Sequence, residues 1–484
     1  MAAREAKTVL AVDLGAESGR VMAVAYDGAS LQVEELHRFP NTPVAVRGTL
    51  YWDFLRLWHE VQTGLAKGKA RQPASLGVDT WGVDFGLLDR QGQLIGNPVH
   101  YRDSRTDGML EAAFERVPRR EIFNHTGIQF MQINTLYQLY SMVQSQSPQL
   151  EMAETLLTAP DLLNYWLTGE RVSEFTIAST TQMVDPRRRA WATELVERMG
   201  IPTRILPEIV PPGTRLGEYE GISVIAPACH DTGSAVAAVP ASSGSDTFAY
   251  ISSGTWSLVG LEVDEPVIDD ATLQANLTNE GGVNGTIRLL KNVTGLWILQ
   301  QCRQAWAAAG HEYNYDQLVQ LARQAPPLRS LLAVDNERFL APGDHVQRVR
   351  DFCRESGQPD LQEHGQVVRA VLESLALAYR EVLEQLQQVS GRSIEVIHIL
   401  GGGSRNELLN QMTADATGLP VLAGPVEATV IGNALLQLIT LGELDDLQQA
   451  RQLVATMGEL RRYEPQDKAA WDDAYNRYRE VAKR

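Results

Sequence analysis

The sequence predicts an α/β protein of two domains that face a cleft. Three observations support this fold class. The chain of 484 residues is too long for one ordinary hydrophobic core. Each half opens with a β-rich stretch and turns α-rich after it. A stretch rich in Pro, Ser and Gly, at 240–244, separates the two halves. We therefore expect domains at residues 1–240 and 241–484.

The composition is that of a soluble globular protein. Hydrophobic residues make up 44% of the chain and charged residues 21%, and the net charge is -17. Such acidity argues against nucleic acid or an anionic membrane as a partner. No run of about 18 apolar residues is present, so no membrane span is expected. The three cysteines form no CxxC pair, which indicates reduced thiols in a cytoplasmic protein.

The first element of the chain is expected to be a phosphate-binding β-hairpin. An apolar run at 9–12 leads to a glycine-bearing turn at 15–19, and a second apolar run follows at 21–26. Glycines let a backbone approach a phosphate closely, and the Ser18 hydroxyl can bond its oxygens. Asp13, at the end of the first strand, could hold Mg²⁺ through water. The alternative is an ordinary glycine hairpin, since short glycine motifs also match by accident.

The middle of the first half is expected to carry a strand, loop and strand at 76–88, followed by mostly helical structure at 107–166. The Pro- and Gly-rich segment 207–217 reads as a connector. Three groups of polar residues in apolar surroundings are candidates for binding a polyol. They are Trp81, Gly82 and Asp84; the run 101–106; and Asn292.

The apolar segment 224–226 predicts a short buried strand that leads into His230, Asp231 and Thr232. A sugar hydroxyl is a poor nucleophile, and a carboxylate within hydrogen-bond reach can take its proton during attack. Asp231 is therefore a candidate general base. The small residues after it are typical of a helix N-terminus, so the alternative is an Asp that only caps a helix.

The second half repeats the strand-turn-strand opening at 248–259, where the Thr255 hydroxyl could bind a phosphate. A long amphipathic helix is expected over 367–386, ended near Gly391. A strand at 394–400 then meets a triple glycine at 401–403, and a helix at 406–417 follows. Strand, glycine turn and helix in this order are typical of a nucleotide site. The alternatives are a plain hairpin turn and a plain loop.

Taken in order, these residues resemble the FGGY family of carbohydrate kinases. The likeness extends from about residue 8 to about residue 440. The matching strings are VDLGA at 12–16, SGR at 18–20, DTWGVDF at 79–85, YRDSRT at 101–106, HDT at 230–232, SSGTWSL at 252–258, NEGG at 279–282, LKN at 290–292, GLW at 295–297 and GPVEA at 424–428. The resemblance implies an α/β fold of two actin-like ATPase (ribonuclease H-like) domains that flank a catalytic cleft.

The resemblance also implies a role for each matching position. Asp231 is the expected catalytic base, and Asp13 the expected metal ligand. The expected contacts to ATP are Ala16, Glu17, Ser18, Gly19, Arg20, Thr255, Gln300 and Gly402. The expected contacts to the ketose are Gly82, His230, Asp231, Thr232 and Asn292. Glu17 departs from the family pattern, which has a small or hydroxyl residue there. A carboxylate beside a triphosphate is unfavourable unless it points away or faces the metal.

The implied activity is ATP- and Mg²⁺-dependent phosphorylation of a ketose at its C1 hydroxyl. Within the family the closest likeness is to the kinases of L-rhamnulose. Two alternatives stay open: a kinase for another ketose or polyol, such as L-fuculose or D-xylulose, and a non-enzymatic switch that uses ATP to change shape. The expected partners are the small-molecule ketose and ATP, and the expected assembly is a monomer or small homo-oligomer.

Overall fold

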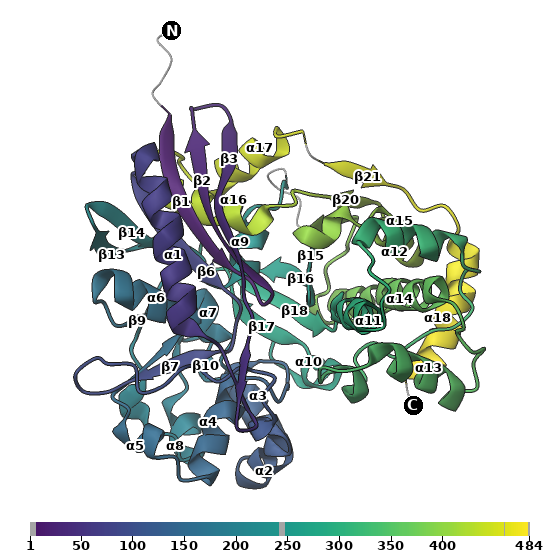
Figure 1. Ribbon diagram of the computed structural model, residues 1–484, viewed down its shortest axis with the longest axis horizontal. Coiled ribbons are helices and arrows are strands. Elements are labelled where there is room, and N and C mark those ends of the chain that lie inside the picture. Colours follow the sequence, from purple (N-terminus) through teal and green to yellow (C-terminus); the bar gives the residue numbers. More distant parts are fainter. Residues whose placement is uncertain (1–5, 242–246, 459, 483–484) are drawn as a thin grey trace. The chain divides into compact units, whose positions relative to one another are not determined.

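The structure, a computed structural model, describes residues 6–241, 247–458 and 460–482. Its chain forms two compact units (Figure 1). The first comprises residues 1–243, 262–290 and 428–458, and the second comprises 244–261, 291–427 and 459–484. Part of the expected linker at 240–244 lies outside the described residues. Among the helices of the described residues, none is both long and apolar enough to cross a lipid bilayer.

A six-stranded sheet forms the centre of the first unit. Its strand order is β13-β14-β6-β1-β2-β3. The bounds are Lys7–Leu14 for β1, Ser18–Tyr26 for β2, Leu31–Pro40 for β3, Ser75–Thr80 for β6, Thr214–Tyr219 for β13 and Ile222–Ala226 for β14. The strands β1, β2 and β3 are antiparallel neighbours, and they lie side by side in purple in Figure 1. By contrast, β6 runs parallel to both β1 and β14.

The strand β1 is buried on both faces. Val9, Leu10, Ala11, Val12 and Leu14 are fully buried, the pattern expected where layers cover both sides of a sheet. One covering helix is α1 (Phe54–Gly68), whose Gly64 lies so close to β2 that a Cβ atom there would come within 2.3 Å of a Val21 methyl group. The first hairpin, predicted from these apolar runs, is confirmed.

The first unit has further elements outside this sheet. Its further strands are β4 (Val44–Val46), β5 (Thr49–Tyr51), β7 (Phe85–Leu88), β8 (Thr155–Thr158), β9 (Val172–Glu174), β10 (Val184–Asp185), β11 (Ala190–Trp191), β12 (Glu208–Val210), β17 (Thr278–Gly281) and the first part of β18 (Ile287–Val293). Its further helices are α2 (Met109–Arg116), α3 (Arg119–Thr126), α4 (Thr135–Gln144), α5 (Pro148–Met152), α6 (Ala159–Thr168), α7 (Phe175–Ser179), α8 (Thr193–Arg198), α9 (Asp231–Ala237), α10 (Asp270–Ala275), α16 (Ala428–Thr440) and α17 (Leu447–Ala455).

The prediction of a plain connector at 207–217 is wrong. This segment contains β12 and the start of β13. β12 pairs in parallel with β9, and β13 pairs antiparallel with β14 across a register shift between Arg215 and Gly217. Pro and Gly are concentrated between these short strands, so composition indicates the turns and hides the pairing.

The second unit has a sheet in which β16, β15, β19, β20 and β21 are neighbours in that order. Their bounds are Ser257–Val263 for β16, Phe248–Ser253 for β15, Val396–Leu400 for β19, Val421–Ala423 for β20 and Arg461–Tyr463 for β21. The helices of this unit are α11 (Trp297–Ala308), α12 (Tyr315–Gln324), α13 (His345–Glu355), α14 (His364–Ser390), α15 (Glu407–Thr417) and α18 (Lys468–Ala482).

Two predicted helix ends are confirmed in the second unit. The long helix α14 ends before Gly391, which adopts φ 67°, and α15 ends before Gly418, which adopts φ 71°. Glycine adopts this left-handed conformation without a Cβ clash, so it stops each helix in a defined direction. Asn406 caps the start of α15 by accepting the Leu409 N–H at 3.0 Å.

Candidate functional site

Three chain segments meet at one edge of the first sheet. The strands β1 and β6 run parallel, with Asp13 directly beside Asp79. The next residue on β6, Thr80, donates its N–H to the carbonyl of Cys229 at 2.9 Å and forms a parallel bridge with His230. Because the carboxyl ends of parallel strands share one edge, the acidic ends of β1 and β6 lie next to the segment that begins at Cys229.

The carboxylate of Asp13 is held by Arg20 from the neighbouring strand. The guanidinium Nη2 of Arg20 lies 2.5 Å from Oδ2 of Asp13, and the two residues are direct cross-strand partners. Asp13 is only 5% exposed. Arg20 therefore gives this buried carboxylate a cationic hydrogen-bond partner.

The tip of the hairpin contains the residues expected to bind phosphate. The Gly15 N–H donates to the Ser18 carbonyl at 3.0 Å, which closes the turn around Ala16 and an exposed Glu17. Gly19 has a packing function, because a Cβ there would lie 2.3 Å from the Phe39 ring. A Cβ at Gly15 would be in ordinary van der Waals contact with the Ser18 carbonyl oxygen, at 3.4 Å. The structure thus explains the two glycines differently.

Asp231 is the first residue of α9, with His230 as the N-cap. Among the described residues, the contacts to its carboxylate fall on Oδ1: the Thr232 N–H at 2.5 Å, the Thr232 hydroxyl at 3.2 Å and Nε2 of His230 at 3.4 Å. Oδ2 is therefore the oxygen available to a substrate. The side chain keeps 29% exposure. Partial burial raises the pKa of Asp231, His230 opposes the rise and Asp13 adds to it. A raised pKa suits a general base.

A buried network holds the loop that carries Asp231. Glu174 accepts the Cys229 N–H at 2.9 Å and the Thr176 hydroxyl at 2.5 Å. The Thr176 oxygen in turn accepts the His230 N–H at 3.1 Å. Asp161 accepts the Glu174 N–H at 3.2 Å. These bonds fix the two backbone amides that precede the candidate base.

The loop network makes stability depend on pH. Burial raises the pKa of Asp161 from its ordinary value of 3.8 to about 7. The folded protein therefore binds this proton more strongly than the unfolded chain does. The resulting stabilisation is complete below about pH 4 and is lost as pH rises through about 7.

We expect Asp161→Asn to remove this pH dependence, because an Asn amide can donate to the hydroxyls of Thr158 and Ser173 that now donate to Asp161. Between pH 5 and pH 8 the free energy of unfolding of the wild type should fall by about 2–3 kcal/mol relative to that of the variant, at about 1.4 kcal/mol per pKa unit. Urea unfolding at both pH values measures the difference. Asp316→Asn, on the surface, controls for the lost charge. Parallel stability curves for the wild type and Asp161→Asn would contradict the assignment.

The loop between β6 and β7 contains a strained residue beside Gly82. Val83 adopts φ 68°, a conformation that is unfavourable for a β-branched side chain. Its N–H donates to Oγ1 of Thr180 at 3.1 Å, and its carbonyl accepts the Thr135 hydroxyl at 2.5 Å. Strain of this kind persists only where the surroundings enforce it, and it is common at functional sites. The substrate contact expected at the neighbouring Gly82 stays a prediction.

Asp84, a candidate for polyol binding, is instead buried and hydrogen-bonded to side chains of the protein interior. It is 1% exposed. It accepts the indole N–H groups of Trp52 and Trp81 at 2.5 and 2.9 Å and the Gln138 amide at 3.1 Å. Burial raises the pKa of Asp84 to about 6. Arg105, from the 101–106 run, donates to Gln138 at 2.6 Å and belongs to the same buried group.

In the second unit, two of the residues expected to bind ATP are in contact. Nε2 of Gln300, on α11, donates to the Thr255 hydroxyl at 3.3 Å. The Thr255 carbonyl accepts the Trp297 N–H at 3.1 Å. Gly295 allows this packing, because a Cβ there would lie 2.6 Å from the Trp256 carbonyl carbon. The β15–β16 turn and the start of α11 therefore form one structure.

The triple glycine lies against the same strand. Gly403 faces β15, where a Cβ would come within 2.0 Å of Oγ of Ser253. Gly402 faces open space, because a Cβ there would meet no atom within 4 Å among the described residues. Asn292, expected to contact the ketose, lies on β18 in the part of that strand that belongs to the second unit.

The oxygen donors beside Asp13 suit Mg²⁺. Oδ1 of Asp79 is buried and has no hydrogen-bond partner among the described residues. Over the same residues, no group of three or more His, Cys, Asp or Glu side chains forms a metal cage. Mg²⁺ keeps several waters and binds through one or two carboxylates together with substrate phosphates. The arrangement around Asp13 therefore fits the ion without such a cage.

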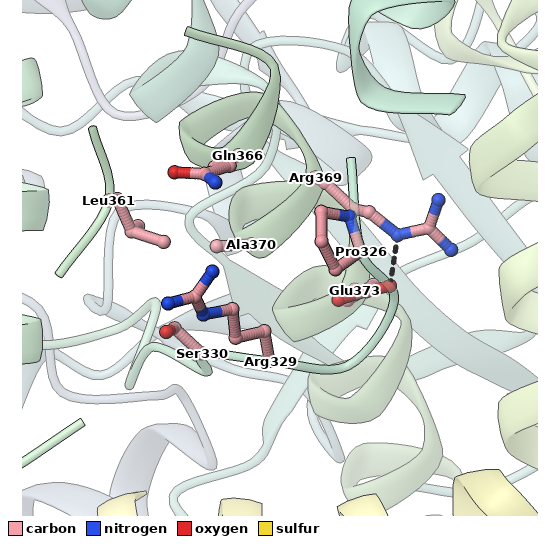
Figure 2. Close-up of a pocket in the computed structure, with 8 residues that line it drawn as sticks. All are labelled: Pro326, Arg329, Ser330, Leu361, Gln366, Arg369, Ala370 and Glu373. Atoms are coloured by element: carbon pink, nitrogen blue, oxygen red, sulfur yellow. Dashed lines mark hydrogen bonds and ion pairs between the residues drawn. The ribbon is translucent and has the colours of Figure 1, made fainter. Parts of the chain in front are cut away.

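A small cavity elsewhere in the second unit does not fit a ligand. Figure 2 shows Arg329, Gln366, Arg369 and Glu373 among the side chains that line it. The charge of Arg369 is matched by Glu373 at 2.6 Å. The cavity volume is about 10 Å³, which is room for about one water molecule.

Several residues of the site were not identified from the sequence. Asn433 donates to Oδ2 of Asp79 at 2.6 Å, from a helix 354 positions away. Glu174 and Thr176 accept the backbone N–H groups of the loop that carries Asp231. Glu280 and Arg288 contact Nδ1 of His230. Glu280 falls within a string that carried the family resemblance, and this was the one available signal.

Comparisons with known proteins show the family of the chain. Two domain models of the FGGY family of carbohydrate kinases match the chain, the N-terminal domain over residues 8–244 and the C-terminal domain over residues 249–441. A rhamnulokinase of Bacteroides thetaiotaomicron is 47% identical over 477 residues, which covers 96% of this chain and 97% of that protein. A rhamnulokinase of Pectobacterium atrosepticum is 42% identical, covering 98% of this chain and 97% of that protein.

Solved structures show the same fold. The gluconate kinase and the xylulose kinase of Lactobacillus acidophilus each superpose with a TM-score of 0.80 over 99% of this chain and 98% of theirs, at 16% identity. The chain therefore has the two-domain α/β fold of these sugar kinases, as the sequence predicted.

Proposed function

The chain belongs to the FGGY family of carbohydrate kinases, and we propose that it transfers a phosphoryl group from ATP to the C1 hydroxyl of L-rhamnulose. The observation that carries the reaction is Asp231, whose Oδ2 is left available at the start of α9. The sugar is proposed from the rhamnulokinases that are 47% and 42% identical over nearly the whole chain.

The sugar is proposed to bind to Gly82, His230, Asp231 and Thr232 of the first unit and to Asn292 of the second. The bonds from Glu174 and Thr176 support this by fixing the backbone before Asp231. Positioning of this kind supplies much of the rate in phosphoryl transfer, because little covalent chemistry is left to the protein.

ATP is proposed to contact the hairpin residues Ala16, Glu17, Ser18, Gly19 and Arg20. In the second unit it is proposed to contact Thr255, Gln300 and Gly402. The hydrogen bond between Gln300 and Thr255 supports their shared role, and the open surroundings of Gly402 leave room for a ligand beside it. Asp13 would hold Mg²⁺, which when bound neutralises charge on the phosphate oxygens.

The proposed reaction moves one proton and one phosphoryl group. Oδ2 of Asp231 accepts the proton of the C1 hydroxyl while the oxygen of this hydroxyl forms a bond to the γ-phosphorus. The bond from the γ-phosphorus to the bridging oxygen breaks, and ADP leaves with the bonding electrons. The products are ADP, the sugar 1-phosphate and the proton that Asp231 releases to solvent.

Two further expectations from the sequence belong to this proposal. We propose that residues 1–240 form the sugar-binding domain and that residues 241–484 form the nucleotide-binding domain. A cytoplasmic location is proposed because Cys229, Cys302 and Cys353 are buried free thiols.

A substrate panel tests the proposed function. ADP production is measured with Mg-ATP and L-rhamnulose, L-fuculose, D-xylulose, L-ribulose or glycerol. The proposal expects the highest kcat/KM for L-rhamnulose. A preference for another polyol would keep the chemistry and overturn the substrate. ATP binding without a response to any sugar would favour an ATP-dependent switch.

Substitution at Gly402 tests the nucleotide side. We expect Gly402→Leu to raise KM for ATP by about tenfold, equal to about 1.4 kcal/mol, and to leave KM for the sugar within about twofold. The side chain enters open space, so the fold should tolerate it. Steady-state kinetics with each substrate varied in turn measures both constants. An equal weakening of both would argue against a place for Gly402 beside the nucleotide.

A further inference from the structure

Behind His230 lies a buried ion pair that the proposed mechanism does not use. Glu280 and Arg288 are direct cross-strand partners on β17 and β18. Nη2 of Arg288 lies 3.2 Å from Oε2 of Glu280. Arg288 is fully buried and Glu280 is 4% exposed. Burying two charges costs much of what their attraction returns, so such a pair adds little net stability and is a candidate for another role.

The guanidinium of Arg288 is aimed at His230. Its Nη2 lies 2.9 Å from Nδ1 of the imidazole. Its Nε donates to the Gly281 carbonyl at 2.8 Å, which fixes the plane of the guanidinium. An arginine side chain has donors and no acceptor. For this contact to be a hydrogen bond, Nδ1 of His230 has to accept, and it can do so only without a proton.

The proton of the neutral ring is then on Nε2. That nitrogen lies 3.4 Å from Oδ1 of Asp231, the candidate base. Glu280 has the opposite preference, because its Oε2 lies 3.3 Å from Nδ1 and could accept a proton placed there. The contact from Arg288 is shorter, and a proton on Nδ1 would face the donors of Arg288. The arrangement favours the Nε2–H form.

We propose that Arg288, held in place by Glu280, is a positioning residue that keeps His230 in the neutral Nε2–H tautomer. His230 then presents a donor to Oδ1 of Asp231. With the Thr232 N–H on the same oxygen at 2.5 Å, this leaves Oδ2 of the carboxylate to take the substrate proton. The inference rests on the proposed function for its catalytic consequence, and the tautomer itself can be measured without any substrate.

The first test is the ¹⁵N spectrum of the wild-type protein with labelled histidines at pH 7.5. The His230 signals are identified by their loss in His230→Gln. We expect an unprotonated Nδ1 and a protonated Nε2 at His230. A ring protonated on Nδ1, alone or together with Nε2, overturns the proposal. The outcome does not depend on which sugar is phosphorylated, so it separates this inference from the proposed function.

The second test compares substitutions of Arg288. Arg288→Met should let His230 populate the Nδ1–H form and lower kcat by about tenfold or more, with a smaller change in KM for the sugar. Arg288→Lys keeps a charged donor and should restore part of both readouts. Should Arg288→Met fail to fold, the wild-type spectrum and Arg288→Lys decide the matter.

A control pair is available in the second unit. Arg369 and Glu373 form another well-shielded pair at 2.6 Å. Arg369→Met should lower stability and leave the His230 tautomer and kcat unchanged. An Arg288→Met variant that folds with the wild-type tautomer and kcat, or an Arg369→Met variant with the same defects as Arg288→Met, would overturn the positioning role.

Discussion

Asp231→Asn is expected to lower kcat by about 10²–10⁴-fold and to leave the fold intact. The Asn side chain is isosteric, and its Oδ1 can still accept the Thr232 N–H that now bonds to Asp231. It cannot take a proton from the sugar. Because burial raises the pKa of Asp231, the substitution also removes a carboxylate that is costly to ionise, and the variant should unfold at a similar or higher temperature.

The measurement is single-turnover kinetics with saturating Mg-ATP and sugar, together with thermal unfolding and the Kd for each substrate. Thr232→Ala is the matched control. It removes the 3.2 Å hydroxyl contact to Oδ1 and keeps the shorter backbone contact, so kcat should fall by about tenfold at most. Near-normal turnover by Asp231→Asn would remove Asp231 from the role of base.

Local patterns predicted the parts of the site that are built from neighbouring residues. The apolar runs on either side of Gly15 predict the first hairpin, whose register in the structure pairs Asp13 with Arg20. The helix ends at Gly391 and Gly418 follow from the conformation that glycine permits. In each case the decisive interactions span fewer than about ten residues, so periodicity and turn chemistry were sufficient.

Longer-range partners could not be predicted in this way. Asp84 was a candidate for polyol binding, and the fold instead surrounds it with the donors of Trp52, Trp81 and Gln138. The pairing of Asp79 with Asn433 joins a strand to a helix 354 positions away. Whether a polar residue faces a ligand or a buried partner depends on tertiary packing, which a single sequence does not encode locally.

Roles within the site divide along the same line. Thr255 and Gln300, both expected to contact ATP, meet in the structure. The hairpin pattern had made Thr255 a candidate for phosphate binding, whereas Gln300 was assigned from the family resemblance alone. Neither the local sequence patterns nor the family resemblance identified Arg288. Its function depends on a hairpin register that sets it opposite Glu280 and on the distance from its guanidinium to His230.

The largest effect on stability is expected at Gly432, on α16. A Cβ at this position would lie 1.7 Å from the Ser234 carbonyl oxygen and 2.6 Å from its carbon. Both are backbone atoms of α9, so no side-chain rotation can relieve the overlap and the two helices must separate. Overpacking costs about 1–3 kcal/mol of stability where side chains can move, and the cost is higher where backbone atoms overlap. We therefore expect Gly432→Ala to lower the free energy of unfolding by at least about 3 kcal/mol.

The same substitution should affect catalysis in the molecules that remain folded, because α9 begins with Asp231. A displacement of α9 moves the candidate base, and misplacement by about 1 Å can cost about 10²-fold in rate. Urea unfolding and kcat per folded molecule measure the two effects. Gly402→Ala is the control for stability, since its Cβ meets no atom within 4 Å. If Gly432→Ala were as stable as this control, α9 and α16 could not pack as closely as the structure has them.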